Sequence, residues 1–346
     1  MKLPRQRLSG IDLWRGIAIF AVILVHADEG VSDLPYLWQI LLNFAEFAVP
    51  FFLATSFWLT VGKIQVSQKT GWLKSRIAKL ILSYLIWSLI YLGYKIAKYT
   101  VAQEPDNWRR ILADPLGIMF QGNAAFHLYF LPLLISGTML LSLLPTNLFW
   151  SRSVTVTIVA TIASLIIYQL GIDIESRNPL INQPPIFEVF GRWLFWGIRC
   201  LPYIAVATLL HHPQLKFYTA RPSKFKTFVW LILFLVINSI SWHSLDSCHE
   251  LLRGYSTLIL AIFISQHRFC LNPAIASLSK CSFGIYLIHL IWIESGQIIE
   301  ARLLSEPWRV STPGLLLFTI VCFCLSWLTV EMLMRRRYLA QIIFST

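Results

Sequence analysis

The sequence predicts an all-α integral membrane protein of about ten transmembrane helices with both termini in the cytoplasm. Hydrophobic residues make up 56% of the 346-residue chain and charged residues only 13%, about half the charged fraction of soluble domains. Apolar stretches of roughly 17–25 residues recur along the chain, and each is long enough to cross a bilayer as a helix. The stretches are continuously apolar rather than alternating, which disfavours membrane-spanning strands.

Ten apolar segments are the expected spans. They cover residues 11–30, 37–61, 77–100, 124–145, 153–171, 191–211, 226–243, 251–268, 282–300 and 314–334. Because no long hydrophilic stretch occurs, we expect residues 1–346 to form a single transmembrane domain with no appended soluble domain. The first segment has the basic start of a signal peptide, but it contains charged residues and no small-residue cleavage site follows. We therefore expect it to be retained as the first helix.

The net charge of +12 comes largely from Lys and Arg in the short loops between spans. Such loops stay in the cytoplasm, so this charge predicts topology rather than a nucleic-acid partner. With a cytoplasmic N-terminus, 19 of the 29 basic residues fall on the cytoplasmic side. These are Lys2, Arg5, Arg7, Arg15, Lys63, Lys69, Lys74, Arg76, Lys79, Arg152, Lys216, Arg221, Lys224, Lys226, Arg268, Lys280, Arg335, Arg336 and Arg337. The pattern favours an even number of spans in a multi-pass protein of the cell (inner) membrane.

The six cysteines form no C-x-x-C pattern and lie mostly within apolar stretches. We interpret them as small buried hydrophobic residues, so we expect neither a disulfide framework nor a metal site.

The first span carries two ionisable residues on one face. Arg15 and His26 are 11 positions apart, which places them within about 20° of each other around a helix and about 16 Å apart along it. Snorkelling to the membrane surface explains an isolated Arg15, but it does not explain His26 deep in the outer half of the span. Ionisable groups within spans are costly and indicate function. A structural alternative for His26 is a hydrogen bond between helices.

Other polar side chains fall in separate spans. Glu46 stands one turn before Pro50, His127 opens the fourth span, and Tyr286 and His289 share a face of the ninth. Each histidine is as consistent with a structural role as with a functional one. The sequence does not show that these groups meet, although together they could line one polar cavity.

Four segments, in order, resemble the membrane-bound acyltransferase type 3 family. They are Ile11–Ala18 with the Arg15–His26 spacing, Val49–Leu53, Phe126–Leu131 and Ser279–His289. A basic pair at the start of the third span, Arg76 and Lys79, also fits. The chain departs from the family pattern at Thr55, Ser56, Tyr129 and Lys79.

The resemblance implies transfer of an acyl group from cytoplasmic acyl-CoA to a hydroxyl of a cell-envelope glycan or a lipid-linked sugar. The expected co-substrate is acetyl-CoA, with succinyl or another short chain as the alternative, and no bound cofactor is implied. Histidine is the side chain best suited to accept a hydroxyl proton near neutral pH. We therefore expect His26 to act as general base in a direct attack, with a covalent acyl-histidine as the alternative.

The remaining polar residues then receive roles. Arg15, Arg76 and Lys79 would bind the phosphates of the donor, although the positive-inside rule alone also explains Arg76 and Lys79. His127 could orient the acceptor or stabilise the oxyanion. Glu46 could orient His26 and raise its basicity.

Tyr286 and His289 could line a tunnel for the donor, and the outer loop from Gly171 to Gly191, with its Pro184–Pro185 pair, would shape acceptor choice. A transporter or flippase for an envelope glycan or small anion is the competing hypothesis, because it also places ionisable residues in spans. Against it, the chain shows no inverted repeat. A membrane scaffold would leave the Arg15–His26 spacing unexplained.

Overall fold

The structure is a computed structural model that describes residues 8–67, 71–144, 153–177, 179, 185–215, 223–240, 246–267, 272–303 and 308–344. The predicted helical class is confirmed: the described residues form helices and turns and contain no strand. The chain divides into two compact units. Unit 1 takes Met1–Thr55 and Phe217–Arg336, and unit 2 takes Ser56–Lys216 and Arg337–Thr346. The single domain expected over residues 1–346 stays a prediction.

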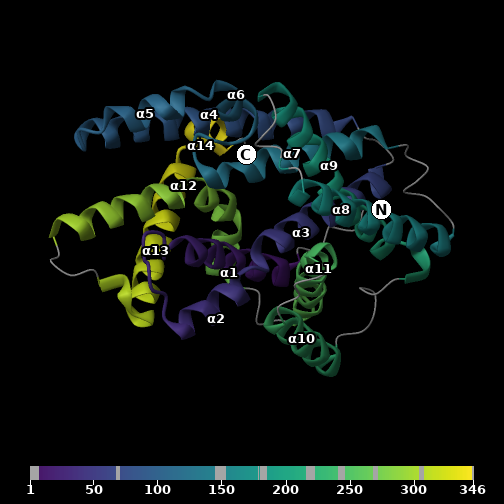
Figure 1. Cartoon of the computed structure of the whole chain (residues 1–346). Coiled ribbons are helices and arrows are strands. Elements are labelled where there is room, and N and C mark those ends of the chain that lie inside the picture. The colour runs from purple at the N-terminus through teal and green to yellow at the C-terminus, as the bar shows by residue number, and fades with distance from the viewer. Residues whose placement is uncertain are drawn as a thin grey trace. The chain divides into compact units, whose positions relative to one another are not determined.

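Unit 1 is built around its first helix, α1 (Ser9–His26), which contacts α2, α11, α12 and α13 (Figure 1). The other elements of unit 1 are α2 (Tyr36–Ala45), the start of α3 (Ala48–Ser67), α10 (Lys224–Ser239), α11 (Asp246–Ile264), α12 (Pro273–Leu303), the short 3-10 helix η7 (Trp308–Val310) and α13 (Thr312–Arg335). Twelve of the 18 residues of α1 are buried, so this helix forms the centre of the unit.

Unit 2 contains the remainder of α3 and the helices that follow it. They are α4 (Trp72–Val101), α5 (Pro105–Leu112), α6 (Pro115–Phe120), η1 (Phe126–Tyr129), α7 (Phe130–Leu143), α8 (Val154–Arg177), α9 (Pro185–Leu210), η4 (Pro213–Leu215) and α14 (Arg337–Phe344). Helix α9 packs against both α7 and α8, and α4 packs against α7. One face of α8 exposes Val159, Ile162, Ile166 and Leu170, as expected for a helix that contacts lipid acyl chains.

Within the described residues, eight helical segments are long and apolar enough to cross a membrane. They include α1, the segment Tyr36–Ser67, α4, Phe126–Leu143, α8, α9, α12 and α13. The two further spans expected from the sequence correspond to α10, which has 16 residues, and α11, which contains Asp246, Glu250 and Arg253. Helices α10 and α11 pack together as a pair. The number of spans is eight if neither of them crosses the membrane and ten if both do, and it is even in either case. The count of ten and the cytoplasmic termini stay predictions.

Several segment boundaries differ from those expected. The span expected over 37–61 is broken between α2 and α3. In a continuous helix the ring of Pro50 would clash with the carbonyl of Glu46, four residues earlier. The loop expected from Gly171 to Gly191 is largely helical, since α8 extends to Arg177 and α9 begins at Pro185.

Some residues of the predicted topology and of the expected outer loop lie outside the described residues. They are Lys2, Arg5, Arg7, Lys69, Arg152, Pro184, Lys216, Arg221 and Arg268.

Helices α1 and α12 run in the same direction. Near the start of both, Ser279 Oγ donates a hydrogen bond of 2.5 Å to Asp12 Oδ1, and both residues are buried. Close packing is possible here because Gly16 faces the side chain of Leu278 without a Cβ between them. Further along, His26 of α1 lies against His289 of α12. Parallel packing of the first span with a later odd-numbered span agrees with a count of either eight or ten.

Candidate active site

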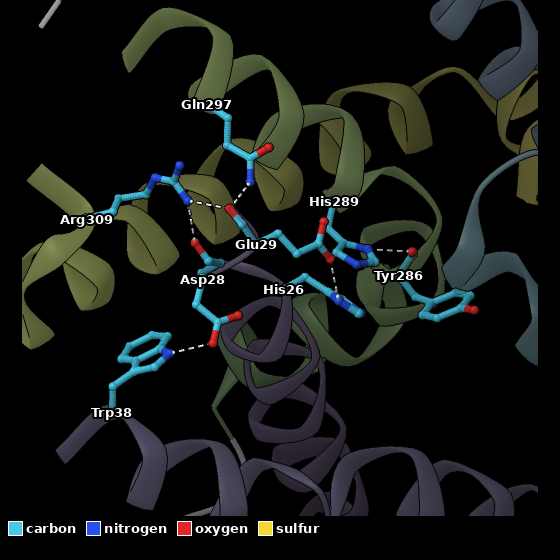
Figure 2. A network of polar contacts seen from close by, with 9 residues as sticks. His26, Asp28, Glu29, Trp38, Tyr286, His289, Gln297 and Arg309 are labelled. Carbon is cyan, nitrogen blue, oxygen red and sulfur yellow. Dashed lines mark hydrogen bonds and ion pairs between the residues drawn. The ribbon is translucent and has the colours of Figure 1, made fainter. Parts of the chain in front are cut away.

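His26 is the last residue of α1, and its side chain is 19% exposed. Its Nδ1 lies 3.1 Å from Oε1 of Glu29, which is one helical turn further along the chain (Figure 2). An ionised carboxylate can only accept a hydrogen bond, so Nδ1 carries the hydrogen in this pair. In the neutral imidazole of this tautomer, the in-plane lone pair is therefore on Nε2. The imidazole acts as a base by accepting a proton at this nitrogen.

His289 of α12 lies beside His26. The two rings stack with centroids 5.5 Å apart and planes inclined by 27°. His289 is completely buried, and its Nδ1–H donates a hydrogen bond of 2.7 Å to the carbonyl oxygen of Tyr286, as Figure 2 shows. The ring of Tyr286 is 6.0 Å from that of His289. Three predicted site residues, His26, Tyr286 and His289, thus come together in unit 1.

Asp28 contributes a second carboxyl near the end of α1. Its Oδ2 accepts a hydrogen bond of 3.1 Å from the indole Nε1–H of Trp38 in α2 (Figure 2). Burial raises the pKa of the Asp28 carboxyl above its ordinary value of 3.8, and the hydrogen bond from Trp38 partly opposes this shift. The segment after α1 therefore presents two carboxyls in different settings, one bonded to an indole and one to an imidazole.

The structure gives Glu46 a different partner from the expected one. Glu46 forms an ion pair with Arg253 of α11, whose guanidinium also donates a hydrogen bond of 2.8 Å to Asn43 Oδ1. Arg253 is 6% exposed, whereas Glu46 is 57% exposed. The expected contact of Glu46 with His26 is corrected, since the carboxylate at His26 Nδ1 is that of Glu29. The physical reason is the break between α2 and α3, which leaves Glu46 at a helix end facing α11. A catalytic role for Glu46 stays a prediction.

Unit 2 holds three other predicted residues. His127 in η1 is 2% exposed and contacts the ring of Tyr91 edge-on, with centroids 5.0 Å apart. Arg76 of α4 donates hydrogen bonds to the hydroxyls of Ser56 and Thr60 of α3. Lys79 is exposed. In unit 1, Arg15 is half-buried on α1.

A guanidinium is a group well suited to phosphates, and the expected role of Arg76 in binding the donor stays a prediction. Within the described ranges, no group of three His, Cys, Asp or Glu side chains is arranged to hold a metal ion.

A family model described as an acyltransferase domain, that of the acyltransferase 3 family, matches residues 8–331. The chain belongs to this family. It is also 22% identical over 336 residues to a protein of Enterococcus faecalis named amino-acid racemase. That match covers 92% of this chain but 45% of the longer relative, so the chain spans less than half of it. No solved structure matches the chain.

The candidate site of this acyltransferase 3 family member includes residues that the sequence did not single out. Glu29 carried a usable signal, because a residue three positions after His26 lies on the same helical face. Arg309 and Gln297 carried none: they reach the segment after α1 from about 270–280 positions further along the chain. Arg253, which lies within a predicted span, deserved selection as an ionisable residue in an apolar segment.

Proposed function

We propose that this protein is a membrane O-acyltransferase that moves a short acyl group, acetyl in the simplest case, from acyl-CoA to a hydroxyl of a cell-envelope glycan or lipid-linked sugar. Membership of the acyltransferase 3 family supports acyl transfer. The observation that supports a catalytic role for His26 is its contact with Glu29, which leaves Nε2 as the proton acceptor. The part-exposure of His26 is compatible with access by a substrate.

In the proposed reaction, His26 Nε2 accepts the proton of the acceptor hydroxyl as its oxygen bonds to the thioester carbonyl carbon. The tetrahedral intermediate then collapses, the carbon–sulfur bond breaks, and the departing CoA thiolate takes the proton from His26. Glu29 stabilises the imidazolium that forms in between, because its carboxylate remains bonded to Nδ1. The ring of His289 limits rotation of the His26 imidazole by stacking on it. No covalent acyl-enzyme is needed in this scheme.

The donor and acceptor contacts proposed for the other residues follow from their chemistry. Arg15 in unit 1, and Arg76 and Lys79 in unit 2, are cations suited to the phosphates of CoA. His127 is proposed to orient the acceptor or stabilise the oxyanion. Each contact can be tested by substituting the residue and comparing the KM for acetyl-CoA with that of the wild type.

The decisive experiment measures transfer of label from [14C]acetyl-CoA to envelope glycans and lipids in membrane vesicles containing the protein. His26→Ala should lower the rate about 100- to 10,000-fold, the usual contribution of a general base. His267→Ala is the matched control, since it removes another half-buried imidazole of unit 1, one that contacts Thr227. Equal transfer by wild-type protein and His26→Ala would overturn the proposed role of His26.

A transporter or flippase for an envelope glycan or small anion is the alternative function, supported by the ionisable residues within apolar helices. Thermal unfolding of the purified protein separates the two. Acetyl-CoA should raise the Tm of an acyltransferase by binding to the folded state, whereas a transporter of another solute should not respond. The match covers less than half of the protein named amino-acid racemase, so that name assigns no activity to this chain.

A further inference from the structure

Residues Ala27–Glu29, which follow α1, are held through their backbone carbonyls. Arg309 Nη1 donates hydrogen bonds of 3.0 Å to the carbonyl oxygens of both Ala27 and Glu29. Gln297 Nε2 donates a third, also of 3.0 Å, to the Glu29 carbonyl (Figure 2). The donors come from η7 and α12, so the end of α1 is fixed by segments remote in sequence. The carbonyl of Ala27, the C-cap residue of α1, is one of the helix-end carbonyls that need such a partner.

Arg309 is itself held in place. Its Nε donates a hydrogen bond of 2.5 Å to Glu300 Oε2, and its backbone N–H donates one of 3.2 Å to Oε1 of the same carboxylate. Arg309 is 7% exposed and Glu300 is 5% exposed, and the guanidinium also lies over the ring of Phe318. The Glu300 carboxylate thus holds both the guanidinium and the backbone N–H of Arg309, and this buried residue is a rigid support because it can move only if its partners move.

The supported backbone belongs to the residue that contacts His26. The Glu29 carbonyl receives two of the three hydrogen bonds, and the Glu29 carboxylate reaches back to Nδ1 of His26. The Glu29 side chain is 36% exposed, so water competes for it. Fixing its Cα restricts the positions open to the carboxylate and favours contact with the imidazole. The chain of contacts thus runs from Glu300 through Arg309 and Glu29 to His26.

We propose that Arg309 is a positioning residue that, supported by Glu300 and together with Gln297, holds the Glu29 carboxylate against His26. This proposal rests on the proposed function of His26 as general base. The proposal gives two polar residues of α12 after His289, Gln297 and Glu300, a supporting role in the reaction. Arg309 contacts no reacting atom in this scheme and acts through the backbone of residues 27–29.

A double-mutant cycle tests the proposal. Its variants are Glu29→Gln, the paired substitution Arg309→Gln with Glu300→Gln, and all three together. The paired substitution removes both charges, so no buried carboxylate is left alone. We expect each of the first two to lower kcat for transfer from [14C]acetyl-CoA about 10-fold or more, with the KM for acetyl-CoA within about 2-fold of wild type. The triple variant should lose little more than either.

A role confined to stability gives different results. Under such a role, kcat per folded protein would stay at the wild-type value in the paired variant. Losses that multiply in the triple variant would instead mean that Arg309 and Glu29 act independently. Either result overturns the proposal. The matched control is Arg335→Gln with Glu331→Gln, which removes an exposed pair of α13 in the same unit and should leave kcat unchanged. If the paired variant is not recovered as folded protein, Gln297→Ala enters the same cycle in its place.

Hydrogen exchange gives a readout that needs no acyl transfer. The backbone N–H groups of Ala27, Glu29 and Val31 donate to carbonyls within residues 24–28, and they should exchange faster in the paired variant than in the control. A second outcome is that the wild-type protein transfers no label while the paired variant still exchanges these N–H groups faster than the control. That result would mean that the proposed function is wrong but that Arg309 does support the backbone after α1. Unchanged exchange in residues 24–31 would overturn the support itself, whatever the activity.

Discussion

The imidazole of His26 stacks on that of His289, with ring centroids 5.5 Å apart. The two residues lie near the ends of parallel stretches of α1 and α12 that are joined at their other end by Asp12 and Ser279. Because Nδ1–H of His289 donates a hydrogen bond to the backbone carbonyl of Tyr286, and the Glu29 carboxylate contacts Nδ1 of His26, each ring is held by its own partner. The pair therefore forms a fixed unit in which one imidazole is partly exposed and the other is buried.

Substitution of His289 should reveal whether its ring or its nitrogens matter. His289→Phe keeps an aromatic ring against His26, and we expect kcat within about 3-fold of wild type. His289→Ala removes the stacking, which contributes about 0.5–1.5 kcal/mol, so we expect a loss of up to about 10-fold in rate. Rates of [14C]acetyl transfer per folded protein decide between them. A loss in His289→Phe as large as that in His26→Ala would assign chemistry to the His289 nitrogens.

The two carboxylates Glu29 and Glu46 should behave differently. Glu29→Gln should lower kcat about 10- to 100-fold, the range known for groups that hydrogen-bond and orient metal-bound histidines, with little change in Tm. Glu46→Gln should mainly lower stability, by about 1.5–3 kcal/mol, because it weakens a hydrogen bond to the charged Arg253. Transfer rates and thermal unfolding of both variants separate the effects. The reverse pattern would return the catalytic role to Glu46.

The sequence predicted the helical class from its apolar stretches, and the order of four short motifs indicated the family. It also predicted that Arg15 and His26 lie on one helix, as α1 shows, because helix formation depends on local sequence. It also selected His289, but not its stacking on His26. Helical periodicity places a residue on a face of its own helix without specifying the neighbouring helix. The contacts that complete the site join α1 to η7 and α12 across some 280 positions, and no local pattern encodes them.

The role of Glu46 shows the same limit. A continuous span was expected around Glu46, but α2 ends at Ala45 and α3 begins at Ala48. The sequence also offered no means of choosing between His26 and Arg253 as the partner of Glu46. The boundary of α8 was also misplaced. A loop was expected to begin at Gly171, but the helix continues to Arg177, and Gln169 donates a hydrogen bond to Asp173 one turn later.

Gly254 of α11 should tolerate no side chain. A Cβ at this position would lie 2.6 Å from the carbonyl oxygen of Pro50 in α3, a contact with backbone that a rotamer change does not relieve. Gly254→Ala should therefore destabilise the protein by about 1–3 kcal/mol, the usual effect of overpacking. Gly93→Ala is the matched control, because a Cβ on that α4 residue meets nothing within 4 Å. Thermal unfolding that is unchanged in Gly254→Ala would contradict the close approach of α11 and α3.

His211, which follows α9, should make unit 2 sensitive to acid. Its Nε2–H donates a hydrogen bond of 2.8 Å to the Trp58 carbonyl, and its ring stacks on the Trp58 indole at 5.0 Å. Burial lowers the pKa of His211 below its ordinary value of 6.5, and the hydrogen bond only partly opposes this. The unfolded chain therefore binds more protons than the folded one just below pH 6.5. The stability that neutral His211 contributes is present above pH 6.5 and is lost as the pH falls.

The Tm of the purified protein should drop between pH 7.5 and 5.5, and His211→Gln, which cannot titrate, should show a smaller drop. An equal drop in the variant would mean that other groups account for the acid sensitivity.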